Sequence, residues 1–165
     1  ARGVSPARVL AVCPVMDPAQ TMAALDAGMP VYRWYFLRRW RRALAAKARA
    51  WPGSLDLDAA RGLRTIGAMT DHFVARYTDY PDTASYLADY ALTGGVLAPL
   101  AVPARVLLAL DDPVIPAAGV RDLALPATLE VEATDRGGHC AFLGDGGARG
   151  WLADYVRAAL GGLAV

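Results

Sequence analysis

The chain has 165 residues, of which 55% are hydrophobic and 20% are charged. This length favours a single globular domain, and the apolar content excludes a disordered tail or a solvated linker. With 17 basic and 16 acidic side chains, the formal net charge of +1 is too balanced for a generic nucleic-acid binder.

The cysteine content limits the cellular setting. Cys13 and Cys140 are the two cysteines, which excludes a scaffold held by several disulfides and fits a reducing compartment.

The first residues lack the basic segment, apolar core and cleavage site of a signal peptide. No apolar run reaches the roughly 18 residues of a membrane span. We therefore expect a cytoplasmic protein.

Short apolar runs near both ends of the chain predict strands. Residues 8–15 (RVLAVCPV) and 104–110 (ARVLLAL) are typical of buried strands. The first run is ended by Pro14 and by Asp17 and Pro18, and the second is ended by residues 111–113 (DDP). Residues 128–133 (TLEVEA) alternate apolar and polar side chains, as in a strand nearer a sheet edge. A helix is expected over residues 151–160. This order predicts an α/β fold. Three strands alone leave long unpaired edges, so we expect the sheet to continue outside this sequence.

The segment between the first two strands is helical in pattern. Apolar side chains recur at Phe36, Trp40 and Leu44, which places them on one face of a helix. Residues 51–53 (WPG) interrupt the pattern. Further helices are expected over residues 58–77 and 82–92, and glycines at 94 and 95 close the segment.

Two loops carry residues suited to catalysis. Asp111 and Asp112 follow the second strand in the motif LDDPVIP, at the strand end where open α/β sheets gather catalytic groups. His139 follows the third strand in the motif GGHCAFL, and a histidine side chain transfers protons near neutral pH. Taken singly, the first motif also fits an Asp-Pro turn, and the second also fits a structural histidine.

Together the two loops suggest a catalytic arrangement. An acid after one strand and a histidine after the next match the second half of the order Ser, Asp or Glu, His found in α/β-hydrolases. In such a triad the carboxylate holds the imidazole in one tautomer, and the imidazole takes the proton of the nucleophile.

The sequence resembles the YheT-like branch of the α/β-hydrolase superfamily. The resemblance covers nearly the whole chain. The segments that carry it are residues 12–18 (VCPVMDP), 35–40 (YFLRRW), 69–73 (MTDHF), 111–116 (DDPVIP) and 137–143 (GGHCAFL). The last two motifs are the most specific. The resemblance implies that the helical segment is a cap over the active site. It also implies that His139 is the catalytic histidine and that Asp112 is the catalytic acid, with Asp111 as the alternative.

The nucleophile of that family lies on a G-x-S-x-G turn, and this chain has no such motif. Its serines are Ser5, Ser54 and Ser85, and Ser5 lies before a proline that removes a backbone N–H. We therefore expect the C-terminal part of a hydrolase. The resulting division is a core strand and exit segment over residues 1–28, a helical cap over 29–95, and a core segment over 96–165 that carries the acid and the histidine.

Other groups are weaker candidates. Cys13 lies within an apolar strand, where a thiol is ordinarily an inert small side chain. Cys140 stands next to His139, but neighbouring residues of an extended segment point apart. A metal site made from His72, His139, Cys140 and Asp71 lacks the close ligand spacing typical of zinc sites. We expect neither a metal nor a cofactor.

The helix over residues 33–49 combines seven basic side chains with Trp34, Tyr35, Phe36 and Trp40. A cap helix with a solvated charged face explains this composition. The alternative is peripheral membrane contact, because basic amphipathic helices with aromatic residues lie at membrane surfaces.

The sequence therefore predicts a serine-dependent carboxylic ester hydrolase, inactive as this piece alone, that acts on acyl or lipid-like esters. The alternative is a non-catalytic module that binds a lipid or a protein partner. No specific nucleic-acid partner is expected.

Overall fold

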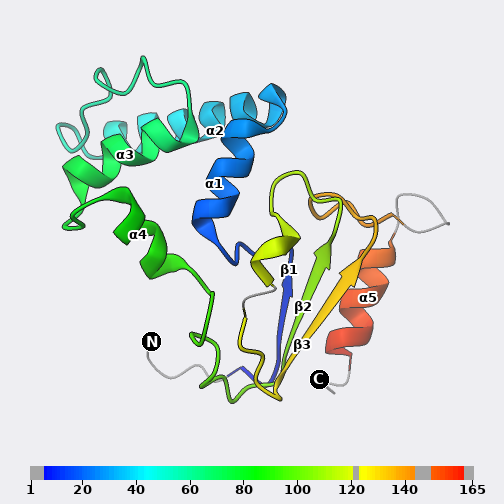
Figure 1. Ribbon diagram of the computed structural model, residues 1–165. Helices are drawn as coiled ribbons and strands as arrows, with labels where there is room; N and C mark the ends of the chain where they lie inside the picture. The colour runs from blue at the N-terminus through cyan, green and yellow to red at the C-terminus, as the bar shows by residue number, and fades with distance from the viewer. Residues whose placement is uncertain (1–5, 121–122, 144–149, 162–165) are drawn as a thin grey trace. The chain divides into compact units, whose positions relative to one another are not determined.

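The computed structural model describes residues 6–120, 123–143 and 150–161 (Figure 1). The chain divides into two compact units. The sheet unit comprises the described parts of residues 1–16 and 92–165, and the helical unit comprises residues 17–91. The helical unit thus includes residues 17–28, which were expected in the first core segment. Its role as a cap stays a prediction.

The sheet unit contains three parallel strands in the order β1, β2, β3 (Figure 1). These are β1 (Val9–Val12), β2 (Ala104–Ala109) and β3 (Leu129–Thr134). In register, Val9 pairs with Ala104, which in turn pairs with Leu129. A short 3-10 helix, η1 (Ala117–Val120), follows β2, and α5 (Trp151–Leu160) ends the unit. The predicted α/β class is confirmed, as are the three strands and the last helix.

Side chains cover both faces of the central strand. On one face, Leu107 and Ala109 of β2 pack with Phe142 and with Leu152 and Tyr155 of α5. On the other face, a second cluster joins Val106 and Leu108 to Leu129, and the side chains of Leu97, Leu100 and Val120 pack against it. This two-sided burial explains the continuous apolar run of β2, because a strand covered on both faces has no solvent side.

The helical unit contains α1 (Pro18–Ala27), α2 (Pro30–Ala50), α3 (Ile66–Tyr77) and α4 (Thr83–Tyr90). Its core is formed by Leu37, Ala60 and Met69, and Trp40, Leu44 and Phe73 pack around them. The predicted apolar face of α2 is therefore confirmed at Trp40 and Leu44. Within the described part of the chain, no helix is both long and apolar enough to cross a membrane.

Two helix predictions were wrong. Helix α1 was not expected, because Asp17 and Pro18 were interpreted only as the end of a strand segment. Asp17 is in fact the N-cap, accepting a hydrogen bond from Gln20 N at 3.0 Å, and Pro18 occupies the first turn.

Helix α3 begins at Ile66 rather than at residue 58, and residues 58–62 form turns. Thr65 caps the helix by accepting a hydrogen bond from Ala68 N. Asp26 of α1 accepts two more, from Ile66 N at 2.7 Å and Gly67 N at 2.8 Å. These bonds satisfy N–H groups that a helix start leaves without intrahelical partners.

Candidate active site

The parallel arrangement brings three loops to one edge of the sheet. Cys13 follows β1, Asp111 and Asp112 lie two and three residues after β2, and His139 lies in the loop after β3. Because parallel strands share a direction, their carboxyl ends meet at this edge. The backbone of the β2 loop is tied to the end of β3, since Leu110 N donates to Thr134 O at 2.8 Å.

The imidazole of His139 contacts the carboxylate of Asp112. Nδ1 of His139 lies 3.0 Å from Oδ2 of Asp112. The Asp112 side chain is 1% exposed, whereas the His139 side chain is 38% exposed. The other carboxylate oxygen, Oδ1, accepts hydrogen bonds from Val114 N at 2.7 Å and from Ile115 N at 3.0 Å. These three contacts compensate the burial of the carboxylate, which is costly without partners.

Asp111 makes different contacts from Asp112. Its Oδ1 accepts hydrogen bonds from Gly137 N at 2.9 Å and Gly138 N at 2.8 Å. The two neighbouring carboxylates therefore divide their contacts: Asp112 reaches the imidazole, and Asp111 holds the backbone of the loop that carries it. This second contact was not predicted from the sequence, in which its signal is the pair of adjacent acids before Pro113.

Close packing fixes the loop around His139. A Cβ added to Gly137 would lie 2.4 Å from the Phe142 ring and 2.9 Å from the Ala109 side chain. Phe142 is buried and stacks on Trp151 of α5, with ring centroids 5.5 Å apart. The loop is a tight turn, with φ of 51° at Gly138 and 62° at Cys140. The expectation of an extended segment at Cys140 was therefore wrong.

This geometry supports a defined proton-transfer chemistry. A carboxylate only accepts hydrogen bonds, so this contact favours the tautomer in which His139 donates Nδ1–H to Asp112 and keeps the Nε2 lone pair available for a proton. The carboxylate would then stabilise the imidazolium that forms. The arrangement can serve as a general base and then as a general acid for a nucleophile placed next to Nε2.

The two cysteines lie close to each other at the same edge. Sγ of Cys13 is 3.9 Å from Gly138 O, and Sγ of Cys140 is 3.9 Å from Val12 O. Cys13 is buried and Cys140 is exposed. Burial raises the pKa of the Cys13 thiol to about 12, and the charges of Cys140 and Asp112 act in the same direction. A thiol in this state is a poor nucleophile, because the thiolate is the reactive form.

Alkylation should distinguish the two thiols. In the native chain at pH 8, we expect iodoacetamide to modify Cys140 and to leave Cys13 unmodified, because Cys13 is buried and protonated. Peptide mass spectrometry after timed quenching measures both sites. In guanidinium chloride both cysteines should react at similar rates. Equal rates in the native chain would contradict the assigned environment of Cys13.

The remaining sequence candidates lie elsewhere. Ser5 falls outside the described residues, and Ser54 and Ser85 belong to the helical unit. His72 and Asp71 belong to α3, where Asp71 accepts a hydrogen bond from Thr83 Oγ at 2.5 Å. In the part of the chain that the structure describes, no group of three or more histidine, cysteine or acidic side chains is placed to hold a metal ion.

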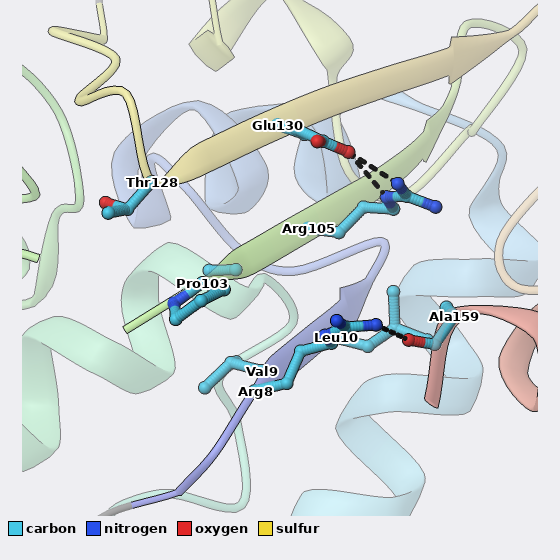
Figure 2. Close-up of a pocket in the computed structure, with 9 residues that line it drawn as sticks. Arg8, Val9, Leu10, Pro103, Arg105, Thr128, Glu130 and Ala159 are labelled. Carbon is cyan, nitrogen blue, oxygen red and sulfur yellow. Dashed lines mark hydrogen bonds and ion pairs between the residues drawn. The ribbon is translucent and has the colours of Figure 1, made fainter. Parts of the chain in front are cut away.

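The sheet unit also has a cavity of about 150 Å³ at the amino ends of the strands (Figure 2). Figure 2 shows that both of its arginines are engaged: Arg105 with Glu130 at 2.5 and 2.9 Å, and Arg8 with the carbonyl of Ala159 at 2.7 Å. Asp112 and His139 follow the opposite ends of the strands, so this cavity is separate from the candidate active site.

Comparison with known proteins gives one informative relative. The chain is 29% identical over 121 residues to an Escherichia coli (strain K12) protein described as "Putative esterase YheT". The match covers 69% of this chain and 34% of that protein, so the chain spans about a third of the length of its relative. No protein-family model and no solved structure matches the chain. The similarity supports a relationship to hydrolases.

Proposed function

We propose that this chain is the C-terminal part of an α/β-hydrolase that cleaves carboxylic esters with a serine nucleophile. The observation that carries the proposal is the contact between His139 Nδ1 and the buried carboxylate of Asp112 at the carboxyl edge of a parallel sheet. The 29% identity to a protein named as an esterase supports the same reaction class.

In the proposed mechanism, Nε2 of His139 removes the proton from a serine hydroxyl as the serine oxygen attacks the ester carbonyl carbon. The resulting tetrahedral intermediate collapses when His139 returns this proton to the departing alcohol. Water then attacks the acyl-serine, with His139 again acting first as base and then as acid. Asp112 orients the imidazole throughout and stabilises its protonated form.

The serine and the oxyanion-hole donors of this mechanism would come from sequence outside the 165 residues. The chain has no G-x-S-x-G motif, and it spans 34% of the length of the relative named as an esterase. The helical unit, with its aromatic and apolar side chains, would act as a cap that favours acyl or lipid-like esters. By itself, the 165-residue chain would be inactive.

The test is ester hydrolysis by the protein translated from the whole reading frame in which these residues occur. We expect turnover of p-nitrophenyl butyrate, and we expect His139→Ala to lower kcat by about 10³-fold or more, because the imidazole is the group that takes the serine proton in the proposed mechanism. Asp135→Asn is the control, since Asp135 is an exposed residue in the same loop region.

Two results would overturn the proposal. One is the absence of turnover across p-nitrophenyl esters of short and long acyl chains, which would favour the non-catalytic binding module. The other is turnover that His139→Ala leaves unchanged. Turnover by the 165-residue chain itself, abolished by His139→Ala, would retain the hydrolase but refute an outside nucleophile.

A further inference from the structure

The helical unit contains a solvent-open cavity lined by four arginines. It has a volume of about 360 Å³ and lies between α2 and the segment that precedes α3. Arg33 and Arg41 line it from α2, and Arg61 and Arg64 line it from the facing segment, with Trp34 and Leu37 beside them. No acidic side chain is among the described residues that line this cavity. A concave surface of one charge concentrates ions of the opposite charge.

Two of these arginines are held in place by backbone carbonyls. Arg41 donates a hydrogen bond to the carbonyl of Leu63, and Arg33 donates one to the carbonyl of Asp26 at 2.5 Å. Each guanidinium has five N–H groups, so donors remain for a ligand. Arg61 pairs with Asp58 at 3.0 Å, but both side chains are 81% exposed, and such a surface pair contributes little.

A second solvent-open cavity, of about 210 Å³, shares two lining residues with the first. Arg41 and Arg61 line both cavities, and the second is otherwise lined by apolar side chains from α2, α3 and the segment between them, including Leu44, Leu57 and Met69. The two cavities thus form a charged end and an apolar end joined at a shared pair of arginines. Guanidinium groups bind carboxylate and phosphate oxygens with matching geometry, and an apolar cavity favours a hydrocarbon chain.

We propose that the helical unit binds a single-chain amphiphile with an oxyanion head group, of the alkyl phosphate or fatty-acid class. The head group would occupy the four-arginine cavity, and the chain would occupy the adjoining apolar cavity. This site is independent of Asp112 and His139, so it stands or falls separately from the hydrolase proposal.

Calorimetric titration of the full 165-residue chain tests the proposal. The probes are monomeric octyl phosphate, inorganic phosphate and 1-octanol. We expect octyl phosphate to bind at least about tenfold more tightly than inorganic phosphate or 1-octanol. Of these three probes, only octyl phosphate has both a head group for the four-arginine cavity and a chain for the apolar cavity. Equal affinity of octyl phosphate and inorganic phosphate would refute the apolar half of the site, and equal affinity of octyl phosphate and octanol would refute the arginine half.

Matched variants locate the site. The double variant Arg61→Gln/Arg64→Gln should weaken octyl phosphate binding by about tenfold or more. The control Arg39→Gln/Arg42→Gln removes the same charge from exposed positions of α2 that line neither cavity, and it should have little effect. Equal weakening by both pairs would show general charge attraction and overturn the proposal.

Two further arms complete the test. Ala45→Leu narrows the apolar cavity and should weaken octyl phosphate binding without changing the affinity for inorganic phosphate. Circular dichroism should show unchanged helix content in each variant. If the chain binds vesicles that contain phosphatidic acid but does not bind monomeric octyl phosphate, the proposed ligand site is refuted. The arginines would then act by attraction to a membrane surface.

Discussion

Replacing Asp112 with asparagine is expected to lower kcat for ester hydrolysis about 10⁴-fold in the protein that carries the nucleophile. The backbone N–H groups of Val114 and Ile115 would keep the oxygen of the new side-chain amide in the place of Oδ1. The amide NH₂ would then face Nδ1 of His139, which must become an acceptor. The imidazole proton would move to Nε2, where it prevents removal of the serine proton.

The adjacent carboxylate provides the matched control. Asp111→Asn keeps an oxygen that can accept the hydrogen bonds of Gly137 N and Gly138 N. Its kcat should therefore stay within about tenfold of the wild-type value, since a neutral acceptor weakens these bonds without removing them. If Asp111→Asn is the inactive variant and Asp112→Asn is active, the assignment of the acid is wrong by one residue.

The tautomer of His139 can be measured without any turnover. In the 165-residue chain, ¹⁵N chemical shifts of the imidazole should show the proton on Nδ1 in the wild type and on Nε2 in Asp112→Asn. His72 is the other histidine, and its signals are assigned with His139→Ala. A proton on Nε2 in the wild type would contradict the proposed role of Asp112.

Replacing Gly137 with alanine is expected to destabilise the chain by about 2 kcal/mol, the usual cost of forcing atoms into a packed core. The new Cβ would overlap the Phe142 ring at 2.4 Å and crowd the Ala109 side chain at 2.9 Å. Phe142 is buried against α5 and cannot move aside freely. The strain should displace the loop and lower kcat by about 10²-fold, as small misplacements of catalytic groups do.

Urea denaturation of the 165-residue chain measures the loss of stability. Gly95→Ala is the control, because a Cβ at Gly95 meets no atom within 4 Å. Its free energy of unfolding should lie within about 0.5 kcal/mol of the wild type. If Gly137→Ala is as stable as Gly95→Ala, the loop around His139 is not held by the packing described.

The sequence by itself predicted the α/β class, because apolar runs of strand length and residues at helical spacing need only local chain geometry to recognise. It also placed an acid and a histidine after neighbouring strands. It missed α1, since Asp17 and Pro18 serve equally as the end of one segment and as the cap and first turn of a helix. It placed the start of α3 too early, because Asp26, distant in sequence, supplies two of the bonds that fix that start.

Only the tertiary structure distinguished the two adjacent carboxylates. A shift of one residue along a loop leaves the motif unchanged, but it decides whether a carboxylate reaches Nδ1 of His139 or the backbone of its loop. The proximity of Cys13 and Cys140 and the meeting of Arg33 and Arg41 with Arg61 and Arg64 are likewise properties of packing. Local patterns specify strands and helices, whereas contacts between distant segments depend on how those elements pack, and it is these contacts that form the candidate sites.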